Sequence, residues 1–479
     1  MRFPRPAAST LAIALAASLA ACQLAPPYTP LNTQTQTPPA FKESGPWTPA
    51  SPEDAAERGD WWAIYGDPVL NDLERRIETS NPDLKVALAR YDEARALELQ
   101  ARAAQYPQVT GNASTTNNLQ SVNRPLRVGG PRQFDDDIIG GTATYEVDLW
   151  GRVRNLVKQG KAETQASQAD LASIKLSLEA QLADAYLSLR GLDAQSKLLA
   201  DTTEAFTKAL RLTQAQHEGG AVPGLDVDRA ETQLQSTKAQ EIDVAAQRAL
   251  LEHEVADLVG EPATTFSLAP VSQLTEPPRV PVSAPSTLLQ RRPDIAAAER
   301  RAAAANAGIG IARTAYFPTI SLNASGGFES SGGVNLLQAS NGFWTLGPAL
   351  AMTLFDGGRR KAVVRQARDQ FDEAAATYRS TVLAAFQQVE DNLALCNKLA
   401  SEAREEDLAV QAARRTEDLS LIQYKMGAVT YLDVVTAQTA DLQAEITALA
   451  IATRRLTASV DLIRALGGGW TEPPAMRTT

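Results

Sequence analysis

Two aspartates, Asp226 and Asp433, are the residues whose placement most clearly suggests a chemical role. Each follows a Gly-Ala-Val turn, in the segments GAVPGLDV and GAVTYLDV, and each stands near the start of a helical stretch. Carboxylates at a helix start ordinarily compensate unpaired N–H groups and the helix dipole. At the narrow end of a pore with rotational symmetry, they would instead form a ring that favours cations. Asp228 is a weaker candidate for such a ring.

Residues that could build a catalytic or metal centre are few. The chain of 479 residues has two histidines and two cysteines, and neither histidine belongs to a His-Glu-x-x-His pair. We therefore predict no enzyme, no metal site and no cofactor. The net charge of −10 argues against a nucleic-acid partner.

Several other polar residues are given ordinary structural roles. His217-Glu218 and His253-Glu254 are expected to face solvent. Asp135, Asp136 and Asp137 are interpreted as an exposed acidic loop rather than a calcium site. Cys396 is expected to be buried on a helix seam, and Arg152 and Arg359 to fix the junctions between strands and helices.

The N-terminus is interpreted as an export signal that ends at a cysteine. Arg2 and Arg5 precede a short apolar stretch, which is typical of a signal peptide. The following Leu-Ala-Ala-Cys resembles the bacterial lipobox, which implies that residues 1–21 are removed and that Cys22 carries a covalent lipid. Gln23 in place of Asp favours the outer membrane. The alternative is an ordinary secretory signal with a chance cysteine. Outside the N-terminus no run of about 20 apolar residues exists, which excludes a helical membrane span in the mature chain.

The rest of the chain contains two copies of one unit. Asn-Pro-Asp-Leu at 81–84 recurs as Arg-Pro-Asp-Ile at 292–295, an offset of 211 residues, whereas the Leu-Asp-Val at 225–227 recurs at an offset of 207. A fixed order of blocks at two nearby offsets indicates an internal duplication. The predicted domains are a lipidated, extended tether, a first repeat, a Pro-rich linker, a second repeat and a C-terminal tail, with the bounds 22–60, 61–260, 261–285, 286–467 and 468–479.

Each repeat predicts helices of very unequal length. Helices are expected over 82–105 and 286–315, each ending before an aromatic-Pro pair. Two very long helices, 152–217 and 359–426, follow, with heptad-like apolar spacing typical of coiled coils. A glycine turn then reverses the chain into shorter return helices over 225–260 and 431–466.

Each repeat also contains two strand candidates. They span about 107–118 and 139–149 in the first repeat, and about 318–328 and 343–355 in the second. Their lengths suit tilted strands that cross a bilayer. Because open strand edges are not tolerated in lipid, completion by other copies is favoured, and three copies would close a barrel of about twelve strands. The predicted fold is mainly α, with a β-barrel and an α-helical tunnel in the trimer.

With these features the sequence resembles the TolC-like outer-membrane efflux factors, specifically the lipoprotein branch of tripartite (RND-type) drug efflux systems. The opening Trp-Trp block at 61–62, the strand exits Leu-Trp-Gly-Arg and Phe-Asp-Gly-Gly-Arg, and the two Gly-Ala-Val-x-x-Leu-Asp-Val turns carry the resemblance. It implies a homotrimer in the outer membrane that extends into the periplasm. A periplasmic membrane-fusion adaptor and an inner-membrane RND-type transporter are the implied partners, and the channel would be a passive exit duct for drugs or other small toxic compounds.

The resemblance also assigns site residues. It places Asp433 among the gate carboxylates, ahead of Asp226 and Asp228, while Thr436 and Val429 stand where the family has a second gate carboxylate and a basic locking residue. The closing network of this chain must therefore differ. The tip that would dock the adaptor comprises Gly219, Gly220, Ala221, Val222, Gly427, Ala428 and Val429.

Two alternatives remain open. One keeps the channel but changes the cargo to metal ions or to proteins of type I secretion. The other is a periplasmic coiled-coil adaptor or structural lipoprotein, which shares long helical hairpins. Two equal repeats, each with strands of bilayer length, favour the channel over the adaptor.

Overall fold

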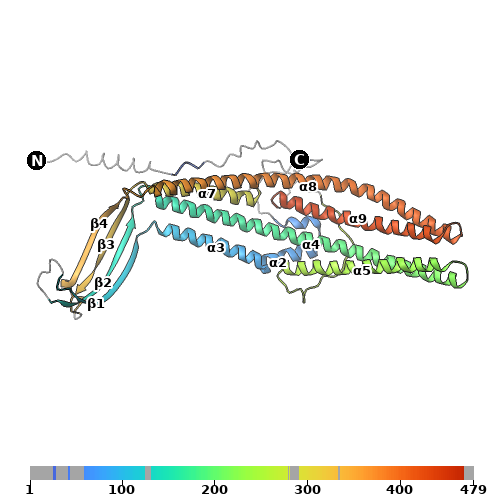
Figure 1. Cartoon of the computed structure of the whole chain (residues 1–479), viewed down its shortest axis with the longest axis horizontal. Helices are drawn as coiled ribbons and strands as arrows, with labels where there is room; N and C mark the ends of the chain where they lie inside the picture. Colours follow the sequence, from blue (N-terminus) through green and yellow to red (C-terminus); the bar gives the residue numbers. More distant parts are fainter. Residues whose placement is uncertain are drawn as a thin grey trace, which may run out of the picture. The chain divides into compact units, whose positions relative to one another are not determined.

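The computed structural model describes residues 25–28, 41–43, 59–123, 131–278, 280, 291–332 and 335–468. Cys22, the predicted lipidation site, lies outside the described residues, as does the tail from 469 onward. The elements, of which Figure 1 labels the α-helices and strands, are η1 (Trp61–Tyr65), α2 (Pro68–Ser80), α3 (Pro82–Ala103), β1 (Gln108–Leu119), β2 (Gln133–Glu146), α4 (Arg152–Glu218), α5 (Gly224–Leu258), α7 (Pro293–Thr314), β3 (Thr319–Ser330), η2 (Ala339–Asn341), β4 (Gly342–Ala351), α8 (Arg359–Lys425) and α9 (Tyr431–Ala465).

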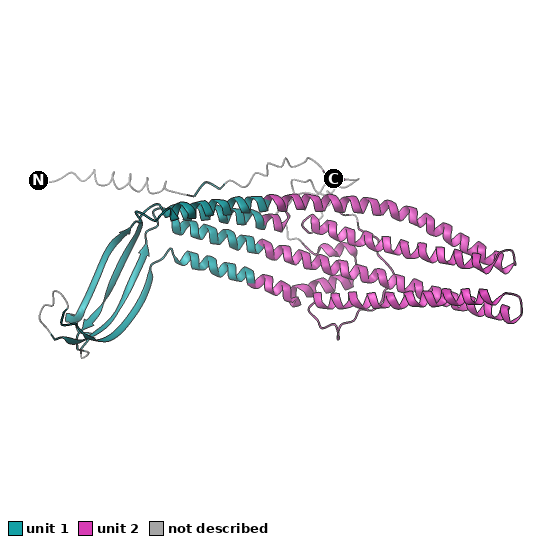
Figure 2. Ribbon diagram, in the orientation of Figure 1, with its two compact units in different colours: residues 1–32, 90–168, 297–378 teal, residues 33–89, 169–296, 379–479 magenta. Residues whose placement is uncertain are grey.

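The chain forms two compact units that do not coincide with the two repeats (Figure 2). The first unit contains the β-sheet and the adjoining parts of α3, α4, α7 and α8. The second contains α2, α5, α9 and the remaining parts of the long helices. Both repeats therefore contribute to each unit. None of the described helices combines the length and the apolarity needed to cross a membrane.

The strands form one antiparallel sheet in the order β1-β2-β3-β4. A row of paired residues across the sheet reads Val109, Ala143, Ala324 and Leu346. The neighbouring row reads Thr110, Thr142, Ser325 and Thr345. Since successive residues of a strand point to opposite faces, these two rows lie on opposite faces of the sheet, one row apolar and the other bearing hydroxyl groups. The outer edges of β1 and β4 have no partner strand within the described sheet.

Glycines allow β2 and β3 to approach closely in the middle of the sheet. Gly140 pairs with Gly327, and Gly141 pairs with Gly326. A Cβ atom added to Gly140 would lie 2.8 Å from the backbone oxygen of Gly326. Because a backbone atom cannot move aside as a flexible side chain can, a larger residue would force the two strands apart.

The expected acidic loop at 135–137 is wrong, because these residues lie inside β2. The strand begins at Gln133 rather than at 139. Asn117 of β1 donates a hydrogen bond to Asp135 at 2.6 Å, and the Thr115 hydroxyl donates to Asp137. The side chains of β1 thus satisfy the carboxylates and extend the pairing beyond the apolar part of the strand. β4 also ends earlier than expected, at Ala351 rather than 355.

The long helices begin and end close to the predicted positions. α4 ends at Glu218 and α8 at Lys425, one residue from each prediction. Carboxylates cap both starts: Asp148 accepts from the Val153 N–H at 3.1 Å, and Asp356 accepts from the Arg360 N–H at 3.1 Å. Of the helix expected over 286–315, residues 286–290 lie outside the described residues, and α7 covers Pro293–Thr314. Arg292, just before Pro293, is not helical, because the helical conformation is disfavoured for the residue that precedes a proline.

The junction arginines are placed partly as predicted. Arg152 forms a bidentate ion pair with Glu146, at 2.7 and 2.6 Å, where β2 passes into α4. In the second repeat Arg360, the neighbour of the predicted Arg359, pairs with the capping Asp356 at 2.7 Å, as Arg154 pairs with Asp148 in the first repeat.

In both repeats, a polar side chain caps the C-terminal end of the return helix. The Asn81 side chain, 3% exposed, donates to the Leu258 carbonyl at 2.7 Å, and Arg292 donates to the Ala465 carbonyl at 2.9 Å. Both donors immediately precede a Pro-Asp helix start, so each repeat closes on itself by capping the carbonyl end of its own return helix.

The described parts of the predicted tether contact the helices instead of extending freely. In the first unit, the Tyr28 hydroxyl donates to the Glu299 carboxylate at 2.8 Å, and Asn306 donates to the Pro26 carbonyl at 3.0 Å. In the second unit, the Lys42 N–H donates to the Glu390 carboxylate at 2.7 Å. Composition alone suggested an extended linker, whereas these polar contacts anchor two short stretches of it.

Candidate functional site: the hairpin tips

Each pair of a long helix and a return helix is joined by a tight turn that glycine makes possible. Gly220 and Gly427 both have φ of 74°, the left-handed conformation that glycine adopts without strain. The Ala221 N–H donates to the Gln216 carbonyl at 2.8 Å, and the Ala428 N–H donates to the Gln423 carbonyl at 2.9 Å. These bonds are the Schellman pattern that closes a helix C-terminus. The predicted Gly-Ala-Val tips are therefore the two hairpin turns.

The two equivalent aspartates differ in structure. Asp433 is exposed and completes a capping box, in which its carboxylate accepts from the Thr430 N–H at 2.8 Å and from the Thr430 hydroxyl at 2.7 Å. These hydrogen bonds hold the pKa of Asp433 below its usual value. Asp226 is only 7% exposed and accepts from Arg229 at 3.2 Å. Asp228 is exposed.

The cause of the difference lies three residues earlier in the chain. The N-cap of α9 is Thr430, which offers both a backbone N–H and a hydroxyl to Asp433. The N-cap of α5 is Pro223, which has neither group. Asp226 therefore cannot form a capping box, and its carboxylate turns toward Arg229 instead. Asp433 thus makes the expected capping hydrogen bonds, whereas Asp226 lies in the first turn of α5, where its charge compensates the helix dipole without a capping box.

A cluster of side chains joins the first hairpin to the second just behind the turns. The Tyr424 hydroxyl donates to the Gln216 amide oxygen at 3.1 Å. The rings of Tyr424 and Tyr431 lie 5.3 Å apart, and Tyr431 packs with Ala230 of α5 and Val434. Burial, with a smaller contribution from nearby Asp226, raises the pKa of Tyr424. We call Gln216, Asp226, Tyr424 and Tyr431 the tip cluster.

The sequence did not reveal the tip cluster, although it showed that Val429 and Thr436 cannot supply the family's usual lock. A signal was present: Tyr424 and Tyr431 flank the second turn and are seven residues apart. Only the packing of α4 against α8 shows that Gln216 is the partner of Tyr424. His217 and His253 are exposed, as predicted. Cys396 is half-buried rather than fully buried, and it donates to the Ala458 carbonyl at 3.5 Å.

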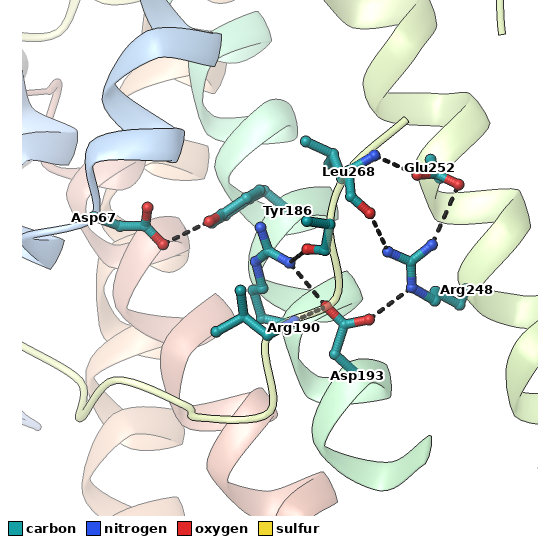
Figure 3. Close-up of polar contacts among 9 residues, drawn as sticks. Asp67, Tyr186, Arg190, Asp193, Arg248, Glu252 and Leu268 are labelled. Atoms are coloured by element: carbon teal, nitrogen blue, oxygen red, sulfur yellow. Dashed lines mark hydrogen bonds and ion pairs between the residues drawn. The ribbon is translucent and has the colours of Figure 1, made fainter. Parts of the chain in front are cut away.

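At the other end of the first hairpin, an ion network holds the segment that leads out of the first repeat (Figure 3). The Asp193 side chain, 1% exposed, accepts from Arg190 at 2.8 Å and from Arg248 at 2.6 Å. Arg248 also donates to the Leu268 carbonyl at 2.6 Å, and Arg190 donates to the Ala269 carbonyl at 2.7 Å. Two arginines thus tie α4, α5 and the connecting segment together, and they fix the base from which the first tip extends.

Comparisons with known proteins agree with this architecture. The profile of the family described as "Outer membrane efflux protein" matches residues 74–261 and 284–468. The chain is 32% identical over 478 residues to the probable efflux pump outer membrane protein TtgC of Pseudomonas putida, covering 97% of this chain and 96% of TtgC. It is 30% identical over 475 residues to the outer membrane protein OprJ of Pseudomonas aeruginosa, covering 98% of this chain and 97% of OprJ.

Solved structures show the same fold. The outer-membrane channel OprN superposes with a TM-score of 0.86 at 29% identity, covering 94% of this chain and all of that one. The outer membrane protein VceC of Vibrio cholerae superposes with a TM-score of 0.80 at 26% identity, covering 88% of this chain and 100% of VceC. The chain therefore belongs to the outer membrane efflux protein family and is the outer-membrane channel of an efflux pump.

Proposed function

We propose that three copies of this chain assemble into a closed barrel of about twelve strands that continues into an α-helical tunnel. The observation that carries this proposal is the register of the sheet. It places apolar residues on one face and hydroxyl-bearing residues on the other, and it leaves both edges open within the described sheet. Lipid would cover the apolar face, neighbouring copies would pair with the edges, and the hydroxyl face would line a water-filled pore.

The exported cargo follows from the pore lining and from the names of relatives. Hydroxyl-bearing side chains offer weak, general hydrogen bonding, which suits passive passage of varied small molecules. The matched relatives include a toluene efflux protein, an antibiotic efflux protein and a pyoverdine export protein. We propose small toxic compounds such as drugs as the cargo, delivered by a periplasmic adaptor and an inner-membrane transporter of the RND type.

The hairpin tips would form the gated end. Three copies of Asp433, exposed and held ionised by Thr430, would give a ring of carboxylates, while the tip cluster joins the two hairpins within each copy. The exposed turn residues, among them Gly219, Gly220, Ala221, Gly427 and Ala428, would receive the adaptor. Opening then requires the second hairpin to separate from the first at the tip cluster. A lipid on Cys22 would add an anchor in the outer membrane.

The test is single-channel recording of the detergent-purified protein in a planar bilayer, after light scattering has established its mass. We expect a trimer with cation-selective conductance. Asp433→Asn should lower the preference for K⁺ over Cl⁻ about two-fold or more, because the ring of charge at the constriction is removed. Asp243→Asn changes an exposed carboxylate farther along α5 and should leave selectivity unchanged. A monomer, or a non-conducting oligomer, would contradict the barrel; unchanged selectivity in Asp433→Asn would contradict the ring alone.

A further inference from the structure

The two hairpins differ at one pair of core positions in their tip halves. With the offset of 207 residues that aligns the Leu-Asp-Val segments, Leu210 and Leu234 correspond to Glu417 and Asp441. Leu234 is 4% exposed and belongs to an apolar cluster against which Leu210 packs. The duplication thus predicts that Glu417 and Asp441 face each other as their leucine counterparts do. The second hairpin carries two carboxyl groups where the first has an apolar contact.

The environment of Asp441 does not compensate a buried charge. Asp441 is 8% exposed, and its Oδ1 has no hydrogen-bond partner among the described residues. Gln438, one turn earlier on α9, is 7% exposed, and its Oε1 also lacks a partner within the described part of the chain. Arg414 of α8 donates instead to Glu445, at 2.7 Å from its Nε. The nearby cation is therefore engaged by a different carboxylate.

The helix packed on the other side of α9 brings no charge to this position either. α5 faces it with Gln233, which accepts from the Thr439 hydroxyl at 3.3 Å, and with Leu234, which packs beside Leu442. A buried carboxylate that is not balanced by a donor or a cation favours its neutral form. Burial first, then repulsion from Glu445 and a hydrogen bond with Glu417, raises the pKa of Asp441 to about 6, and Arg414 opposes this rise.

We propose that the buried Asp441 carboxyl carries a proton and donates it in a hydrogen bond to Glu417, that this bond holds α9 against α8 near the second tip, and that loss of the proton loosens the second hairpin. A protonated carboxyl donates to its ionised partner, whereas two ionised carboxylates repel each other. The pKa of Asp441 is higher in the packed hairpin than in an exposed one, so the stabilisation is complete at low pH. It declines as the pH rises from the usual aspartate range through about 6.

The consequence is a pH-dependent difference between the two hairpins. Hydrogen–deuterium exchange of the full-length protein in detergent, at pH 5 and pH 7.5, would measure it in peptides covering 431–446 and 224–239. After correction for intrinsic exchange rates, the opening equilibrium constant of α9 should be about tenfold larger at pH 7.5 than at pH 5. Each pH unit between the unfolded and folded pKa values of an acid changes such an equilibrium about tenfold. The α5 peptide, with leucines at the matching positions, should not change.

Variants separate the carboxyl pair from other titrating groups. Asp441→Asn should remove the pH dependence of the α9 peptide, and Asp441→Leu, which restores the residue of the first hairpin, should protect α9 at both pH values. Asp418→Asn removes an exposed carboxylate beside Glu417 and should behave as the unchanged protein. If an Asp441 variant fails to fold, Glu417→Gln provides the same test.

The proposal is overturned if α9 responds to pH in Asp441→Asn as it does in the unchanged protein, or if α5 responds equally. Exchange is measured on the folded chain whatever its conductance. A failure of this inference is therefore distinguishable from a failure of the proposed trimeric channel.

Discussion

Buried carboxylates are unusually frequent in the second unit, and their neighbours decide their charge. Glu179 accepts from the Trp61 indole at 3.0 Å and lies 3.8 Å from Lys175, yet burial still raises its pKa to about 7. Glu74 is fully buried, and neither carboxylate oxygen has a hydrogen-bond partner among the described residues. Burial and the nearby Glu179 raise the pKa of Glu74 well above its usual value. Folding therefore favours the neutral form of Glu74.

Glu74→Gln should make the protein more stable above neutral pH. An acid whose pKa is raised by folding lowers the free energy of unfolding as the pH rises from its unfolded pKa toward its folded pKa. A neutral amide removes this loss, so we expect a Tm at pH 8 about 1 °C higher, corresponding to about 1 kcal/mol in a chain of this length. Thermal unfolding at pH 5 and pH 8 measures both the gain and its pH dependence.

The matched control is Glu93→Gln, which neutralises an exposed carboxylate of α3. Its unfolding curve should follow that of the unchanged protein at both pH values. Equal Tm shifts in Glu74→Gln at pH 5 and pH 8 would show that packing, and not protonation, governs this position.

At the scale of elements, the two helical hairpins are built alike but finished differently at their tips. Both turns close with the same Schellman pattern, at Gly220 and Gly427. The N-caps that follow, Pro223 and Thr430, then direct one aspartate inward and leave the other exposed. Near the turns, the hairpins are connected by the hydrogen bond from Tyr424 to Gln216, beside a tilted pair of tyrosine rings. Thr439 donates a second one to Gln233. So few hydrogen bonds are weak enough to break during opening.

Tyr424→Phe should increase the open fraction of the channel. The variant keeps the ring against Tyr431 but removes the hydroxyl that donates to Gln216. A hydrogen bond contributes about 1 kcal/mol, so the closed-to-open ratio should fall about fivefold. Single-channel recordings of open probability provide the measurement. Tyr91→Phe, on α3 beside Arg95, is the control and should behave as the unchanged protein. An unchanged open probability in Tyr424→Phe would remove the tip cluster from the gate.

At the scale of the whole molecule, both repeats are needed for each of the two units. The sheet takes β1 and β2 from the first repeat and β3 and β4 from the second, paired through the Gly140 and Gly327 contact. One repeat alone would supply a two-stranded ribbon, which is marginally stable at best. Both repeats are therefore needed to form the four-stranded sheet, and deletion of either repeat should abolish it.

The lipid anchor gives a prediction for the complete protein in cells. Cys22→Ser should abolish incorporation of labelled palmitate and remove the corresponding lipid mass from the intact protein. The chain has only one other cysteine, Cys396, so Cys396→Ser is the matched control and should retain the label. Label retained in Cys22→Ser would contradict lipidation at this position.

Much of the fold could be predicted because it is encoded in neighbouring residues. The absence of proline over 152–217 predicts a long helix, and glycines end it at Gly219 and Gly220. The repeated Pro-Asp and Leu-Asp-Val segments predict a duplicated architecture. Strand ends are predicted less accurately from the sequence. At Asp135, β2 is extended by a hydrogen bond from a side chain of β1, and no alternation of apolar residues marks this part of the strand.

The sequence by itself determined the duplication, the helix lengths and the hairpin turns, since proline, glycine and apolar periodicity act over a few residues. Only the tertiary structure decided which side chains meet across helices. Asp226 and Asp433 stand in matching motifs, yet one is buried beside Arg229 and the other exposed. Tyr424 forms a hydrogen bond with Gln216, which lies 208 residues away in the sequence. Such partners depend on how distant helices pack, and local sequence patterns carry no record of that packing.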